Sequence, residues 1–307
     1  MSTIKKRKIL VITSTYDKTV DMIISRFSSL VEFFRFDVDN MLAYDITVSA
    51  DFFSIKSGGS SINSDCCKSI YYRKPSNSQI QKLFNSPYDQ FATKELFALV
   101  EGIAEIFDGR CLTRPSVMKL ANNKVYQGKV AKLCGFNQPI SVITNSLSNI
   151  SLINDECIIV KPLAVGTIVF PTHKEYVQTN LYNPDYDSEA LTYSPAYFQK
   201  YQNKDFEVRL TVIDGSFFAV KIQSTNLIDW RRSGAENTYQ YIDTPDPIKN
   251  QCSEYMAKMN MHFGCFDFIV YENEWFFLEM NVNGQWAWLE EVAGIDIGSK
   301  IMGYLNA

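Results

Sequence analysis

The chain has 307 residues, 46% of them hydrophobic and 21% charged, with a formal net charge of −4, which is typical of a globular protein of roughly two domains. Its lysines and arginines form no long basic run, and no apolar run approaches the roughly 20 residues that span a bilayer, so the sequence predicts neither nucleic-acid nor membrane binding. Seven cysteines without a CxxC motif and only two histidines argue against a zinc site and against histidine-dependent catalysis, and we expect reduced thiols in a cytoplasmic protein.

The first third of the sequence alternates between strand-like and helix-like segments. Lys8–Thr13 predicts a strand, and apolar residues at near-helical spacing predict a helix over Lys18–Leu30. The stretch Lys56–Asp65 is rich in Ser, Gly and Asn, which is typical of a mobile loop or a hairpin tip. The remaining segments predict strands over Phe33–Phe36, Asp45–Val48 and Ser69–Arg73 and a long helix over Tyr88–Phe107. Such alternation predicts an N-terminal α/β domain.

Helix caps and tight turns mark the boundaries in the rest of the chain. Ser116 is expected to cap one helix, and the Asn123 side chain is expected to cap a second helix that ends before Gly135. The second half of the chain is mostly β in pattern, and Asp214-Gly215 predicts a tight hairpin turn. The expected hairpin strands are Val208–Ile213, Phe217–Ile222, Phe266–Tyr271 and Trp275–Met280.

The segment from Asp267 to Asn281 has a pattern of acidic residues that suits a metal site. With the three-residue loop Glu272–Glu274, Asp267 would face Glu279 across a hairpin, and Asn281 would lie on the same face. Opposed carboxylates about 5 Å apart repel each other, so water must screen this pair or a cation must neutralise it. Two carboxylates and an amide oxygen suit Mg²⁺ that carries nucleotide phosphates. The pattern alone leaves a magnesium site and a solvated hairpin both open.

Three basic residues stand in positions that suit phosphate binding. Lys124 lies in the first turn of its helix, where the helix dipole is positive, and a bound phosphate would explain its presence there. Lys161 ends the apolar strand Ile158–Val160. Arg209 shares a strand face with Glu207 and is either a structural partner of it or a phosphate clamp. For the two lysines, exposure to solvent is the alternative interpretation.

Short motifs that contain these residues follow one another along the chain. They are Tyr71–Pro75, Asn123-Lys124, Val160–Pro162, Phe198–Tyr201, Glu207–Arg209, Asp229–Arg231, Asp267 and Phe277–Trp286. In this order they resemble the ATP-grasp superfamily, and most of all its graspetide peptide maturases, the microviridin-type ligases and their grasp-with-spasm relatives. The resemblance covers nearly the whole chain and is most specific in Glu279–Trp286. Val282 and Lys74 stand where Pro and Arg are common, and the loop after Ala50 does not match clearly.

The resemblance implies the ATP-grasp fold, an α/β (α+β) architecture in three domains. Residues 1–114 would form an N-terminal α/β domain, residues 115–200 a central lid domain, and residues 201–307 a C-terminal antiparallel-sheet domain with the metal site. The lid, Pro115–Lys200, is expected to be mobile and to fold over ATP, which excludes water. Because related maturases are often dimers, the resemblance also implies a homodimer.

The resemblance also assigns roles to residues by position. ATP and Mg²⁺ are the implied cofactors, and the expected catalytic residues are Arg209, Lys161 and Arg231. Lys124 and Lys161 would contact the ATP phosphates, and Arg209 would stabilise the transferred phosphate. The hinge that holds adenine would be Gln199, Lys200 and Tyr201, the magnesium ligands Asp267, Glu279 and Asn281, and the acceptor side Arg231 and Asn283.

The implied reaction is the ATP-dependent ligation of a carboxylate in a ribosomal precursor peptide that has a leader and a core. An Asp or Glu side chain of the core would be activated as an acylphosphate, and a Ser, Thr or Lys side chain of the same peptide would then attack it, closing an ester or amide ring. Two alternatives stay open. One is a ligase that adds a free amino acid to a peptide or protein, and the other is a non-catalytic module that binds a leader peptide.

Overall fold

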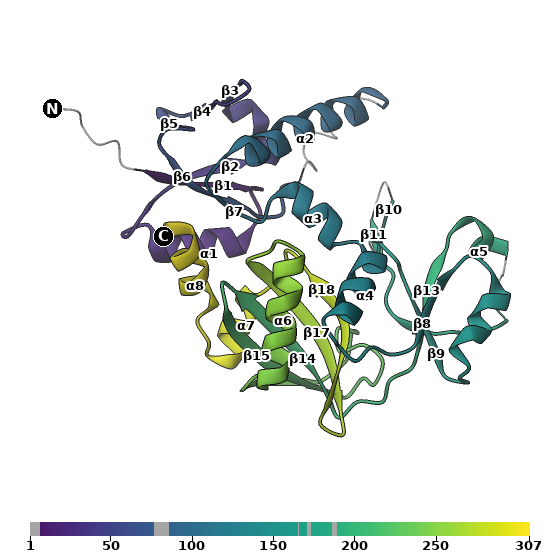
Figure 1. Cartoon of the computed structure of the whole chain (residues 1–307). Helices are drawn as coiled ribbons and strands as arrows, with labels where there is room; N and C mark the ends of the chain where they lie inside the picture. Colours follow the sequence, from purple (N-terminus) through teal and green to yellow (C-terminus); the bar gives the residue numbers. More distant parts are fainter. Residues whose placement is uncertain (1–6, 77–85, 165, 171–172, 186–188) are drawn as a thin grey trace. The chain divides into compact units, whose positions relative to one another are not determined.

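A computed structural model describes residues 7–76, 86–164, 166–170, 173–185 and 189–307. The chain divides into two compact units, which are described separately (Figure 1). Within the described ranges, no helix is long and apolar enough to span a membrane. The first unit is Met1–Lys119 with Met261–Phe263 and Asp296–Ala307, and the second is Leu120–Asn260 with Gly264–Ile295.

The first unit is built on a parallel sheet with the strand order β2-β1-β6-β7. Residues Ile9–Ile12 of β1 are fully buried, as expected of a central parallel strand that is covered on both faces. The strand–helix alternation predicted for this part of the chain is confirmed. The elements are β1 (Lys8–Thr13), α1 (Lys18–Phe27), β2 (Glu32–Asp37), β6 (Cys67–Tyr72), α2 (Tyr88–Ile106), β7 (Arg110–Leu112) and α8 (Ile297–Asn306).

Two segments of the first unit refine the sequence prediction. Helix α1 ends at Phe27, three residues before the predicted end. Its last backbone bond runs from the Ser28 N–H to Ile24 O. Leu30, which was predicted to continue the buried face, is exposed to solvent. The Lys56–Asp65 stretch contains the tip and the second strand of the β4–β5 hairpin. The predicted hairpin tip is therefore confirmed over the alternative of a mobile loop. This three-stranded sheet consists of β3 (Asp45–Val48), β4 (Phe53–Ser57) and β5 (Ser60–Asn63), and it follows a 3₁₀ segment, η1 (Val38–Ala43).

The helix starts were predicted with mixed success. Helix α3 (Pro115–Ala121) begins at Pro115 itself, a residue whose missing N–H and fixed φ suit the first helical position. Ser116 is therefore inside the helix, and the prediction that it caps the helix is wrong; its N–H donates to Glu105 Oε1 at 2.8 Å instead. Helix α4 (Lys124–Leu133) does begin after Asn123, whose Oδ1 accepts from the Tyr126 N–H at 3.1 Å.

The second unit contains a four-stranded antiparallel sheet in the order β12-β9-β13-β8. A small apolar cluster of Ile150, Ile153 and Phe198 packs on it. The sheet places Lys161 and Gln199 on neighbouring strands. The elements are β8 (Ser141–Thr144), η3 (Leu147–Ile153), β9 (Ile158–Lys161), β12 (Asn180–Leu181), α5 (Glu189–Tyr193) and β13 (Ala196–Lys200), with a two-stranded ribbon of β10 (Thr167–Val169) and β11 (Lys174–Tyr176).

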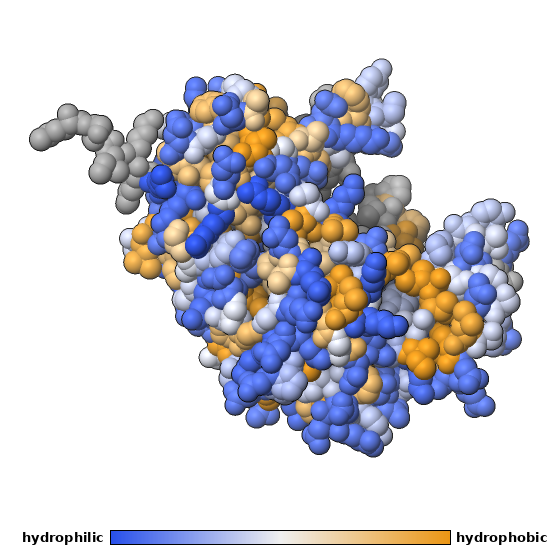
Figure 2. Space-filling view, in the orientation of Figure 1, coloured by the Kyte–Doolittle hydropathy of each residue, from blue (hydrophilic) through white to orange (hydrophobic). Residues whose placement is uncertain are grey.

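The second unit also contains a five-stranded sheet in the order β16-β15-β14-β17-β18. Helix α6 buries Ile248, Cys252 and Tyr255, and its outer face is largely hydrophilic (Figure 2). Among the described residues, which include all seven cysteines, no disulfide is present. The elements are β14 (Phe206–Ile213), β15 (Ser216–Ser224), β16 (Asn237–Ile242), α6 (Asp246–Lys258), β17 (Phe263–Tyr271), β18 (Glu274–Asn281) and α7 (Ala287–Ala293).

The β17–β18 hairpin differs from the prediction in its loop but keeps the predicted acidic pair. The loop has two residues, Glu272 and Asn273, with φ values of 51° and 66°, so Tyr271 pairs with Glu274. This conformation matches the right-handed twist of the flanking strands, which favours two-residue loops. A β-bulge between Asp267 and Phe268 then shifts the register by one residue, and Asp267 faces Glu279 after all.

The β14–β15 turn allows a test of the fold. Gly215 has a φ of 76°, and a Cβ added there would have nothing within 4 Å. The substitution Gly215→Ala should therefore lower the free energy of unfolding by about 1–2 kcal/mol, because an L-residue is strained in this region of φ. Urea denaturation measures the change.

A matched control for this test is Gly102→Ala. Gly102 lies inside α2 and also has nothing within 4 Å of an added Cβ, so alanine should raise stability there by up to about 1 kcal/mol. An unchanged or higher stability of the Gly215→Ala variant would contradict the turn geometry.

Candidate active site

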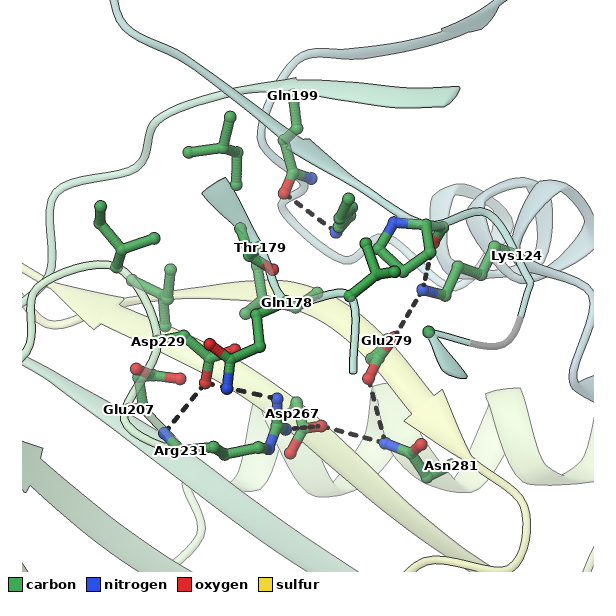
Figure 3. Close-up of a pocket in the computed structure, with 18 of the residues that line it drawn as sticks. Lys124, Gln178, Thr179, Gln199, Glu207, Asp229, Arg231, Asp267, Glu279 and Asn281 are labelled. Carbon is green, nitrogen blue, oxygen red and sulfur yellow. Dashed lines mark hydrogen bonds and ion pairs between the residues drawn. The ribbon is translucent and has the colours of Figure 1, made fainter. Parts of the chain in front are cut away.

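Residues of both sheets of the second unit line a cavity of 810 Å³. Most of the residues singled out in the sequence meet here, although they come from one helix, four strands and two loops (Figure 3). Arg209, Lys200 and Asn283 are not among the lining residues. Those that do line the cavity are Lys124, Lys161, Gln199, Tyr201, Arg231, Asp267, Glu279 and Asn281.

The Asp267 carboxylate accepts hydrogen bonds from two arginines and one side-chain amide. Arg209 Nη1 donates to both of its oxygens, at 2.6 and 2.7 Å. Arg231 Nη2 and Asn281 Nδ2 donate to Oδ2 at 3.3 and 3.0 Å. Asp267 is only 6% exposed, and a buried carboxylate requires such partners because water cannot solvate its charge.

Glu279 faces Asp267 on β18 and has its own positive partner. Lys124 Nζ lies 3.3 Å from Oε2, and Asn281 Nδ2 donates to Oε1 at 3.3 Å. Burial alone would raise the pKa of Glu279, but the positive charges of Lys124, Lys161 and Arg231 outweigh it and lower this pKa to about 2. Glu279 is therefore ionised at neutral pH.

Arg209 is positioned by close backbone packing as well as by charge. Burial disfavours its charge, but Asp267 more than compensates and raises the pKa of Arg209 above its ordinary value. A Cβ on Gly284 would lie 2.5 Å from the Cβ of Cys265 and 3.2 Å from Arg209 Nη2. Only glycine fits at this position, since any side chain would push against both neighbours.

Lys161 ends β9, which belongs to a different sheet from the β17–β18 hairpin. Its Nζ donates to Gln199 Oε1 at 3.1 Å and lies 4.3 Å from the centre of the Tyr197 ring, a cation–π contact. Burial lowers the pKa of Lys161 to about 8, although the nearby Glu279 carboxylate works in the other direction. At neutral pH Lys161 is thus charged.

The predicted hinge residues point in different directions. Gln199 lines the cavity, and so does Tyr201, whose hydroxyl donates to Leu227 O at 3.2 Å. The Lys200 side chain instead forms an ion pair with Asp155 Oδ2 at 2.9 Å. Because side chains alternate along a strand, Lys200 lies on the other face of β13 from its neighbour Gln199.

Several lining residues were given no role from the sequence. Burial raises the pKa of Glu207, against the opposing effect of Lys204. Glu207 and Asp229 stand in the motifs Glu207–Arg209 and Asp229–Arg231. Their closeness in sequence to Arg209 and Arg231 could have marked them as site residues. The others come from loops and helix faces that no sequence pattern marks. The set includes Glu207, Asp229, Gln127, Gln178, Thr179 and Gln202.

The arrangement suits a polyanion that carries a divalent cation. Lys124, Lys161 and Arg231 supply positive charge to the cavity, while Asp267 and Glu279 supply hard oxygen ligands on one face of the hairpin. In addition, Arg209 Nε is buried and makes no hydrogen bond. Positive groups near a pair of carboxylates can balance the negative charge of a bound phosphate chain and the negative charge of the carboxylates that hold its metal ion.

Comparison with solved structures identifies the fold. A RiPP-associated ATP-grasp ligase of Chryseobacterium gregarium, in complex with ADP and a leader and core peptide, is 24% identical, with a TM-score of 0.84 over 97% of this chain and 95% of that chain. The macrocyclase MdnC of Microcystis aeruginosa MRC, bound with the precursor peptide MdnA, is 22% identical, with a TM-score of 0.86 over 98% and 100%. The ATP-grasp ligase PsnB, complexed with minimal precursor, Mg and ADP, is 20% identical, with a TM-score of 0.78 over 97% and 96%.

The chain therefore has the ATP-grasp fold, as the sequence predicted. Within that class, its fold is that of RiPP-associated ligases and macrocyclases over nearly the full length of both chains. No model of a protein family matches the chain, and no curated protein matches it.

The pKa of Lys161 predicts how affinity for a phosphate chain depends on pH, with ATP as the test ligand. Its positive charge is present below about pH 8 and is lost as pH rises through this value, so affinity for the phosphates should fall by about tenfold from pH 7 to pH 9. Isothermal titration calorimetry with ATP, in the absence of peptide, measures this.

The variant Lys161→Met is the control for the pH dependence. It should bind ATP weakly at both pH values, with no fall between them. A wild-type affinity that stays constant from pH 7 to pH 9 would contradict a role for the charged lysine.

Proposed function

We propose that the protein is an ATP-dependent carboxylate ligase that cross-links a ribosomal precursor peptide. The observation that carries this proposal is the pair of opposed carboxylates, Asp267 and Glu279, surrounded by positive groups in a cavity of an ATP-grasp fold. The likeness to solved ligases supports it, since those structures contain ADP, Mg and precursor peptides. The Asp or Glu side chain of the core peptide is the carboxylate that becomes activated.

ATP and magnesium fit the residues that line the cavity. Asp267, Glu279 and Asn281 would hold Mg²⁺, which neutralises phosphate charge and polarises the γ-phosphoryl group. Lys124 and Lys161 would contact the phosphates. Adenine would lie against the hinge segment, in which Gln199 and Tyr201 line the cavity and Lys200 stabilises the hinge through Asp155.

The proposed reaction has two steps. In the first, a peptide carboxylate oxygen attacks the γ-phosphorus of ATP, ADP leaves, and an acylphosphate forms. Arg209 and Arg231 stabilise the charge that builds up on the transferred phosphoryl group. In the second step a hydroxyl or amine of the same peptide attacks the acyl carbon, loses its proton, and releases phosphate. The product is a cyclic ester or amide.

Three segments of the chain would divide the work of the enzyme. Residues 1–114, 115–200 and 201–307 would act as an N-terminal domain, a lid and a catalytic domain, with Arg231 and Asn283 on the acceptor side. The lid would close over ATP and exclude water, which protects the acylphosphate from hydrolysis. The protein would work as a homodimer in the cytoplasm on a leader-bearing peptide.

Mass spectrometry of a precursor peptide tests the proposed function. A small peptide rich in Thr, Ser, Glu and Asp, encoded near this protein, should lose about 18 Da per bond when incubated with the protein, ATP and Mg²⁺. A gain in mass when free amino acids are present would indicate the amino-acid-adding ligase instead. An unchanged peptide without ATP consumption would reject the ligase and favour a leader-binding module.

The metal assignment has its own test. The substitutions Glu279→Gln and Asp267→Asn should each lower turnover by at least about a hundredfold, because they remove charge from the magnesium site. Steady-state ATP consumption measures the loss, and circular dichroism reports whether the fold is kept. Glu274→Gln, which changes an exposed carboxylate of the same strand, is the matched control and should retain activity. Turnover close to wild type in either site variant would overturn the assignment.

A further inference from the structure

The buried side chain of Gln127 connects helix α4 to strand β18, which both line the cavity. Gln127 lies on α4 and is 4% exposed. Its Nε2 donates to Met280 O at 2.8 Å, and its Oε1 accepts from the Met280 N–H at 2.9 Å. A third bond runs from Nε2 to Ala121 O at 2.8 Å. The side-chain amide thus uses both its donor and its acceptor on one residue of β18.

The bonds of Gln127 satisfy backbone groups of Met280 at the edge of the sheet. Strand β18 is the last in the order of the five-stranded sheet, so no further strand of the described residues pairs with its outer side. An isolated bridge at Asn137, whose O accepts from the Phe277 N–H at 2.8 Å, covers another part of this edge. Unbonded backbone groups in a buried position are unfavourable. At Met280, Gln127 provides the donor and the acceptor that a sixth strand would have provided.

Met280 lies between Glu279 and Asn281, the two residues of β18 that would hold magnesium. Lys124 lies about one helical turn before Gln127 on α4, and its Nζ is 3.3 Å from Glu279 Oε2. Holding α4 against Met280 therefore determines where Lys124 stands relative to Glu279. A displacement of about 1 Å at such a site can cost up to about a hundredfold in efficiency.

We infer that Gln127 is a positioning residue that holds Lys124, Glu279 and Asn281 in register for magnesium-bound nucleotide. This inference rests on the proposed function, because it takes Glu279 and Asn281 as the magnesium ligands. All three printed hydrogen bonds of the Gln127 amide go to backbone atoms. Gln127 acts through the backbone of Met280 and through the start of α4.

The test compares ATP affinity with and without Mg²⁺ in the full-length protein. In Gln127→Met the shape of the side chain is kept while all three hydrogen bonds are lost. We expect the gain in affinity that Mg²⁺ produces to fall at least tenfold relative to wild type, measured by calorimetry in Mg²⁺ and in EDTA. Damage to the adenine side of the cavity would weaken both measurements equally and leave this ratio unchanged.

The matched control is Gln138→Met. Gln138 donates a single bond to Gly128 O, also on α4, at 3.2 Å, and it is not among the lining residues of the cavity. Its variant should keep the wild-type ratio. If Gln127→Met does not unfold cooperatively, Gln127→Glu replaces it, because this variant keeps the acceptor for the Met280 N–H and loses the donors.

The outcomes separate the two proposals. A wild-type protein whose ATP affinity does not respond to Mg²⁺ would overturn the proposed function. A wild type that responds, together with a Gln127 variant of equal ratio, would overturn the positioning role and leave the proposed function intact. Equal loss of the ratio in the Gln127 and Gln138 variants would overturn it as well, because the effect would then be a general one of α4.

Discussion

The organisation of the cavity depends on one electrostatic constraint, which is that Asp267 and Glu279 face each other on adjacent strands. Two unit charges about 5 Å apart at a partly buried site repel each other by about 3 kcal/mol. Arg209 and Lys124 each contact one of the two carboxylates and offset this repulsion. The helix α4, the strand β14 and the hairpin must therefore meet at this point for the unit to be stable.

Glu279 and Lys161, on different sides of this charge balance, are both ionised at neutral pH. The pKa of Glu279 is lowered to about 2 and that of Lys161 is lowered to about 8. Between these values both groups are charged, so the balance of opposite charges is constant near neutral pH. The pKa of Glu279 moves away from neutrality and that of Lys161 moves toward it, yet both groups are charged at pH 7, which suits the binding of a charged ligand.

The sequence predicted most element types from local patterns, whereas most of the cavity residues that it singled out were assigned through the resemblance to ATP-grasp ligases. A predicted three-residue loop indicated that Asp267 and Glu279 face each other; the loop is wrong, but the bulge compensates for it. Asn123 correctly marked the start of α4. Alternation along β13 already places Lys200 on the other face from Gln199. The partner of Lys200, Asp155, and the bonds of Gln127 to Met280 could not be predicted, since only tertiary packing supplies them.

The β-bulge in the β17–β18 hairpin has a consequence for comparing distant sequences. A two-residue loop with a bulge brings Asp267 opposite Glu279, and a three-residue loop without a bulge would do the same. The pairing depends on the total number of residues between the two carboxylates, whichever strand or loop holds the extra one. An alignment of this region should therefore tolerate compensating gaps inside the hairpin and should anchor on its two acidic residues.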